Sequence, residues 1–88
     1  MIEIKTESGF TCKLPKDAMD DAELWDILSG KYPNEMHRNS ALANHLLGDQ
    51  KPVLYEHLRK IHGKVPASAL EKELCDIFAC FGNAGKNS

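Results

Sequence analysis

The stretch PASALEKELCDIFACF, residues 66–81, carries the strongest helical pattern in this 88-residue chain. Its large apolar residues recur at the spacing of one helix face: Leu70, Leu74, Ile77, Phe78 and Phe81. That periodicity predicts an amphipathic helix over residues 66–81. Pro66 suits its first turn, where the N–H groups have no helical partner. Residues 82–88 contain no large apolar side chain, so we expect them to form a flexible polar tail.

Three shorter helices are expected before this stretch. The first begins with Asp20 as its N-cap and Glu23 completing a capping box, and it ends near residue 29 because Gly30 follows. Trp25 is expected on its inward face. Residues 31–38 are polar and contain a proline, so they are predicted to form a loop.

The second and third helices follow this loop. Asn39 or Ser40 can cap the second helix, and Gly48 ends it. Asp49 can cap the third, which carries a proline in its first turn and ends at Gly63. Its apolar residues are spaced four and then three apart, as Leu54, Leu58 and Ile61.

Residues 2–14 alternate between apolar and polar side chains. The apolar set is Ile2, Ile4, Phe10, Cys12 and Leu14. Alternation broken by Ser8 and Gly9 predicts a β-hairpin. A lone hairpin is marginally stable in water, so its apolar face is expected to lie on the helices.

The expected fold is therefore α+β: an N-terminal β-hairpin packed on a small cluster of about four helices. Residues 1–81 form the single domain of this prediction, and residues 82–88 form the tail. The residues expected in its core are Ile4, Phe10, Trp25, Leu54, Leu58, Leu74 and Ile77.

Charge and hydropathy make two classes of partner unlikely. The formal net charge is −2, with eleven basic residues dispersed among thirteen acidic ones. Nucleic-acid binding ordinarily needs a basic face, so no nucleic acid is expected. No apolar run approaches the roughly 20 residues that span a bilayer, and the N-terminus lacks the apolar core of a signal peptide. We therefore expect a cytoplasmic protein with no membrane partner.

The histidines and cysteines do not form a recognisable metal or catalytic motif. His57 and His62 are five residues apart, as are Cys75 and Cys80, which places each pair on different faces of a helix. Cys12 lies on the apolar side of the hairpin, where a free thiol behaves as a small core residue. No phosphate loop, nucleophile elbow or carboxylate pair is present. We expect no metal, no cofactor, no intrachain disulfide and no enzymatic activity.

The last helix is the expected partner-binding element. It carries more large apolar groups than three short helices are expected to cover, and uncovered apolar surface usually meets a partner. Phe78 and Phe81 are the preferred anchors, with Leu74 on the same face.

Several phrases, in order along the chain, resemble one family. They are "IEIKTESGFTCKLPKDAMDDAELWDIL", "LLGDQKPVLYEHLRKIHGKVPASALEKELCDIF" and "AGKNS". Together they resemble the tail assembly chaperones of long, non-contractile-tailed bacteriophages and prophages of low-GC Gram-positive bacteria. The resemblance implies a non-enzymatic protein that coats the tape-measure protein before tail-tube subunits polymerise, and that is absent from the mature virion. The tail-tube protein and a second copy of the chain are further candidate partners.

The resemblance also gives the last residues a meaning. In that family some ribosomes slip back one nucleotide near the stop codon and make a longer form. Ala84-Gly85-Lys86 can be encoded by GCG GGA AAA, and Gly85-Lys86-Asn87 by GGA AAA AAC, and both contain slippery heptamers. The sequence is thus compatible with a frameshifted form, and equally with a frayed polar terminus.

Two functions of other classes stay open. The first is a small cytosolic helical adaptor or regulatory module that binds one folded protein. The second is a redox- or metal-responsive protein that uses the cysteines. Genomic neighbours distinguish the first from a tail chaperone, and thiol titration with metal analysis tests the second.

Overall fold

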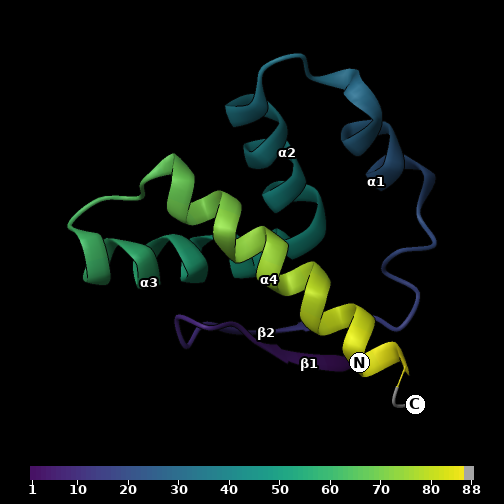
Figure 1. Cartoon of the computed structure of the whole chain (residues 1–88), viewed down its shortest axis with the longest axis horizontal. Helices are drawn as coiled ribbons and strands as arrows, with labels where there is room; N and C mark the ends of the chain where they lie inside the picture. Colours follow the sequence, from purple (N-terminus) through teal and green to yellow (C-terminus); the bar gives the residue numbers. More distant parts are fainter. Residues whose placement is uncertain (87–88) are drawn as a thin grey trace.

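The computed structural model describes the backbone of residues 1–86 and the side chains through Asn83. It confirms the α+β fold: a two-stranded antiparallel hairpin lies beneath a cluster of helices (Figure 1). The chain order is β1 (Ile2–Lys5), β2 (Thr11–Leu14), α1 (Ala22–Asp26), α2 (Glu35–Leu47), α3 (Lys51–His62) and α4 (Ala67–Lys86). A π-helical turn, Ile27–Lys31, continues α1, and a 3-10 turn, Gly48–Gln50, joins α2 to α3.

The hairpin forms as its alternation predicts. Ile4 pairs with Cys12 and Ile2 with Leu14, so the apolar side chains share the face toward the helices. The Thr6 N–H donates to the Phe10 carbonyl at 2.8 Å and closes the turn, in which Gly9 has a φ of +97°. Glu3, Lys5, Thr11 and Lys13 point outward and are exposed.

Gln50 covers part of the free edge of β2. Its Oε1 accepts from the Lys13 backbone N–H at 2.8 Å, and its Nε2 donates to the Lys13 carbonyl at 2.9 Å. Both backbone groups of Lys13 are thereby satisfied as a third strand would satisfy them. A capped edge is less able to pair with another chain.

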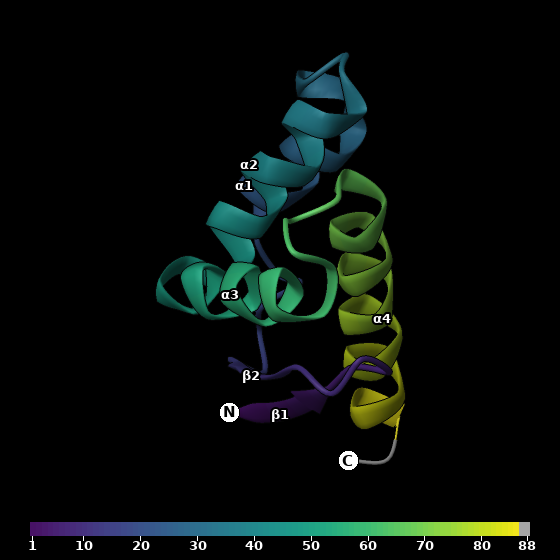
Figure 2. The same ribbon diagram turned by 90° about the vertical axis from the view of Figure 1, so that its left-hand side faces the viewer.

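Helix α4 crosses the hairpin and also packs against α2 (Figure 2). Leu70, Leu74 and Ile77 are buried, as the periodicity predicts. The helix does not end near Phe81, however, but continues through residues 82–86 to Lys86. The lack of large apolar groups ends the buried face, but it does not interrupt the backbone hydrogen bonds, and Ala84 and Lys86 have good helix propensity. Asn87 and Ser88 lie outside the described residues.

The start of α1 differs from the prediction by one residue. Asp21, not Asp20, is the N-cap, and its Oδ1 accepts from the N–H groups of Glu23 at 3.0 Å and Leu24 at 3.4 Å. Leu24 and Ile27 are the inward residues of this short segment.

Trp25 is consequently not a core residue, and that prediction was wrong. Leu24 takes the inward position of this short helix, and Trp25, about 100° around the helix from it, lies outside the core. The Trp25 side chain is 53 % exposed, and its indole Nε1–H donates to the Met19 carbonyl at 2.8 Å.

Helix α2 begins earlier than expected, inside the predicted loop over residues 31–38. Asn34 is its N-cap and accepts from the N–H groups of Met36 at 2.8 Å and His37 at 3.2 Å. Asn39, one of the two predicted caps, lies buried within the helix instead. Proline before Asn34 marks the end of the preceding extended segment, which places the cap directly after it.

The predicted ends of α2 and α3 are correct. Gly48 and Gly63 follow these helices with positive φ of +52° and +81°. Asp49 makes no side-chain cap, because the 3-10 turn continues directly into α3.

One continuous core joins the hairpin to the helices. Its fully buried members include Ile4, Leu14, Leu24, Leu54, Leu58 and Ile77. Six of the seven predicted core residues are buried, Trp25 being the exception.

A candidate partner-binding groove

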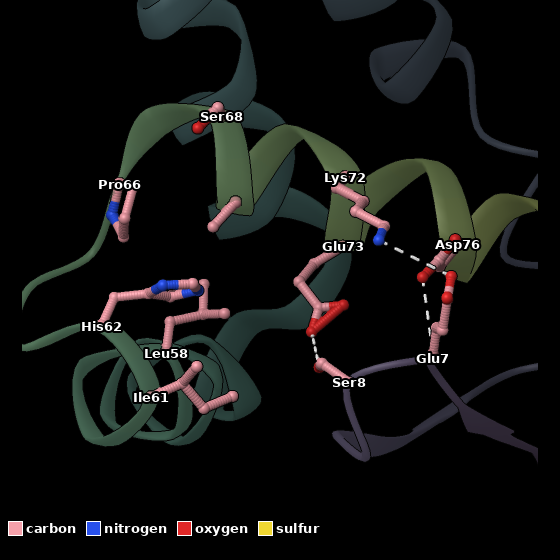
Figure 3. Close-up of a pocket in the computed structure, with 11 residues that line it drawn as sticks. Glu7, Ser8, Leu58, Ile61, His62, Pro66, Ser68, Lys72, Glu73 and Asp76 are labelled. Carbon is pink, nitrogen blue, oxygen red and sulfur yellow. Dashed lines mark hydrogen bonds and ion pairs between the residues drawn. The ribbon is translucent and has the colours of Figure 1, made fainter.

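A groove of about 650 Å³ opens between α3, the first half of α4 and the hairpin turn (Figure 3). It exists because Gly63 ends α3 and the short connection to Ala67 sends α4 away in a different direction (Figure 2). The two helices therefore approach each other at the connection and leave their facing sides partly uncovered. The apolar lining of this groove comes from Leu58, Ile61, Pro66 and Ala69.

Ile61 is the large apolar residue that this groove leaves most open. Its side chain is 52 % exposed, although Leu58, one turn earlier in α3, is only 2 % exposed. Val53, near the start of α3, is also exposed, at 60 %, but it does not line the groove. The pair provides a natural comparison between an exposed apolar residue inside the groove and one outside it.

The hairpin end of the groove is polar. Glu73 is only 2 % exposed, and its Oε1 accepts hydrogen bonds from the hydroxyls of Thr6, at 3.2 Å, and Ser8. The Glu7 backbone N–H donates to Asp76 Oδ2 at 3.4 Å, and Lys72 Nζ lies 3.6 Å from Glu7 Oε2. These contacts hold the hairpin turn against α4 (Figure 3).

Ser8 also contacts His57, which raises the possibility of nucleophilic chemistry. The Ser8 Oγ lies 3.1 Å from His57 Nε2. In a Ser-His-Asp triad the histidine stands between hydroxyl and carboxylate, because it must take the proton while the carboxylate stabilises the imidazolium. Here the hydroxyl stands between Glu73 and His57. The arrangement therefore suits a structural link from the hairpin to α3 and α4 better than acyl transfer.

The cysteines and histidines are dispersed. Cys12 is buried, Cys75 is exposed, Cys80 is half-buried, and all three thiols are free. His57 contacts the hairpin turn, whereas His62 lines the groove. Through Asn83, no three His, Cys, Asp or Glu side chains come together as a metal-binding group.

Two titratable groups outside the groove have shifted pKa values. Burial, assisted by Cys80 and Glu73, raises the pKa of Cys12 to about 11. A hydrogen bond from His45, whose Nε2 lies 2.8 Å from Asp21 Oδ2, lowers the pKa of Asp21 below its usual value. The shift at Cys12 arises where the hairpin packs against α4, and the shift at Asp21 arises where the start of α1 meets α2.

The predicted anchors on the last helix do not line the groove. Leu74 is buried in the core, and Phe78 and Phe81 are half-buried and packed against it. Gly85 and Lys86 belong to α4, and Asn87 lies outside the described residues. The groove residue that the sequence did not single out is Ile61, whose helical spacing from Leu54 and Leu58 was visible but gave no sign that it would be exposed.

In the part of the chain that the structure describes, no helix has the length and apolarity needed to cross a bilayer. No protein-family model, curated protein or solved structure matches this chain.

Proposed function

We propose that this protein is a tail assembly chaperone that binds helical segments of a phage tape-measure protein through the groove between α3 and α4. The observation that carries the proposal is this open groove, whose apolar lining includes the half-exposed Ile61. An amphipathic helix binds such a groove by placing its apolar stripe on the floor. The ordered resemblance in the sequence supports a tape-measure protein as the partner.

The chemistry of the groove suits a chaperone that must later leave. A tape-measure protein is a long helical chain, and its apolar stripes favour aggregation while they are bare. One groove of about 650 Å³ covers only a short part of such a stripe, so each copy is expected to bind weakly. Many copies along one rod would then supply the avidity, and growth of the tail tube would displace them in turn.

Coexpression tests this function directly. The chain is produced together with the tape-measure protein encoded by the same phage or prophage genome, and the soluble fraction of the tape-measure protein is measured. We expect the wild-type chain and the Val53→Asp variant to keep it soluble, and the Ile61→Asp variant to fail. A tape-measure protein that stays insoluble with the wild-type chain would contradict the proposal.

Stoichiometry separates this function from that of an adaptor. The molar mass of the purified complexes is measured by light scattering. Several copies of the chain per tape-measure protein are expected of a chaperone, whereas one copy bound to one folded host protein would indicate the adaptor.

A longer, frameshifted form belongs to the same proposal. The messenger RNA over codons 84–87 is expected to contain one of the two slippery heptamers, followed by an open minus-one frame. Mass spectrometry of phage-expressing cells is then expected to show a minor longer product. An mRNA without either heptamer would remove this part of the proposal.

A further inference from the structure

We infer that the groove selects a helix with a lysine or arginine beside its apolar stripe, and that Glu73 and Asp76 receive this cation. The inference rests on the proposed function, because it specifies the partner of the same groove. It concerns the polar hairpin end, whereas the apolar floor serves any amphipathic helix.

The charges that line the groove are unbalanced. Three carboxylates, those of Glu7, Glu73 and Asp76, face a single ammonium group, that of Lys72. Lys72 Nζ lies 3.6 Å from Glu7 Oε2, which leaves Glu73 and Asp76 without an ion-pair partner among the described residues. The hairpin end is therefore complementary to a cation, and complementary charge contributes specificity and orientation to a docked partner.

Of these three carboxylates, Glu73 is the one whose surroundings most favour a cationic partner. It is 2 % exposed, and its hydrogen bonds in the described chain come from two neutral hydroxyl groups, both to Oε1. A carboxylate removed from water is costly unless it is paired and hydrogen-bonded. Glu73 nevertheless lines the groove, together with the half-buried Asp76 one turn along α4. A cationic side chain entering the groove would meet the wall formed by these two carboxylates.

The layout of the groove gives the partner its pattern. The apolar residues Ile61 and Ala69 lie toward the α3–α4 connection, and Glu73 lies one turn beyond Ala69 along α4. Residues three or four apart on a helix are neighbours on one face. The partner helix is therefore expected to carry two large apolar residues one turn apart and a lysine or arginine one further turn along.

Two synthetic peptides test this pattern. Each is an alanine-rich helix with two leucines one turn apart. The first carries lysine one further turn on, and the second carries glutamine there. Binding to the full chain is measured by fluorescence anisotropy at low salt. We expect the lysine peptide to bind the wild-type chain roughly tenfold more tightly, as a charge-assisted contact to a largely desolvated carboxylate allows.

Variants assign that difference to the groove carboxylates. Glu73→Gln keeps an acceptor for the Thr6 and Ser8 hydroxyls but removes the charge, so it should abolish the preference for lysine while leaving the glutamine peptide's Kd unchanged. Asp76→Asn should also reduce the preference for the lysine peptide. This variant tests the inference if the Glu73→Gln chain does not fold. Glu71→Gln, an exposed site on α4 outside the groove, should preserve it. The Kd values of the two peptides for the wild-type chain and for Glu73→Gln form a double-mutant cycle, which isolates the interaction between the peptide lysine and Glu73.

The outcomes distinguish this inference from the proposed function. Equal binding of both peptides to the wild-type chain, or a preference that survives both variants, overturns the inference and leaves the groove intact as a helix site. Failure of both peptides to bind also overturns it, while coexpression with the tape-measure protein decides the function independently. Loss of both peptides in Ile61→Asp, with retention in Val53→Asp, places the binding in the groove.

Discussion

Helices α3 and α4 have similar amphipathic patterns but different surroundings. In α4 the residues Leu70, Leu74 and Ile77 are buried, because the helix lies between the hairpin and α2. In α3 the first two residues of the stripe are buried, but Ile61 in the last turns is half-exposed. Periodicity identifies the residues that share a face, whereas the arrangement of the other elements decides how far along the helix that face is covered. The uncovered end of α3 is the surface to which our proposal assigns the partner.

The largest effect is expected where α4 closes the core. Leu74→Ala should lower the free energy of unfolding by about 2–5 kcal/mol, because it removes buried methyl groups and leaves a cavity between α4 and the hairpin. Denaturant titration followed by circular dichroism measures this change. A loss below about 1 kcal/mol would mean that α4 is no better covered than the end of α3.

A smaller effect is expected at the start of α2, the helix on which both α3 and α4 pack. Asn34→Ala should cost about 1 kcal/mol, because two N–H groups in the first turn lose their side-chain acceptor. Thermal unfolding measures the change, and Asn34→Asp is the matched control, since aspartate caps as well as asparagine. Equal stability of the alanine variant and the wild type would argue that this first turn frays.

The alkaline range tests the contact between the hairpin and α4 in another way. The pKa of Cys12 is about 11 in the folded chain, above its ordinary value of 9.0, so the folded state holds the thiol proton more tightly than the unfolded state. The protonated Cys12 thiol therefore makes its full contribution to the free energy of unfolding below pH 9, and this contribution is lost as the pH rises through about 11.

Comparison of two chains isolates this contribution from other groups that titrate in the same range. The stability of the wild type should fall more steeply between pH 9 and 11 than that of Cys12→Ala, as measured by urea unfolding at a series of pH values. Parallel curves for the two chains would show that Cys12 ionises as readily in the fold as in the unfolded chain. Exposed Cys75 should meanwhile react with a thiol reagent much faster than Cys12.

Local sequence signals predicted the hairpin, the helix ends at glycine and most of the core, because each depends on the nearest few residues. The errors arose where two local solutions compete. Asp20 and Asp21 can both cap α1, and Leu24 and Trp25 can both face inward; the structure has Asp21 as the cap and Leu24 in the core. Phe78 and Phe81 lie half-buried on α4 outside the groove, and their role as anchors stays a prediction.

The groove could not be predicted, because it depends on the relative directions of α3 and α4. Nothing within the sequence of α3 distinguishes Leu58 from Ile61, since both belong to one apolar stripe. The polar contacts at the hairpin end are equally non-local: Thr6 and Glu73 are 67 residues apart in sequence. Such a pairing follows only once the hairpin and α4 are placed against each other.

The smallest effect on stability is expected at Ile61, and it is the most informative about the difference between the two helices. Ile61→Gln keeps good helix propensity and removes an apolar side chain that is already half in solvent, so the free energy of unfolding should change by no more than about 0.5 kcal/mol. The same substitution should abolish binding of the leucine peptides, because it places an amide on the floor of the groove. Val53→Gln, at a similarly exposed site on the same helix, should change neither property. If Ile61→Gln instead lost several kcal/mol, the end of α3 would be as firmly packed as α4, and the groove would not be a binding surface.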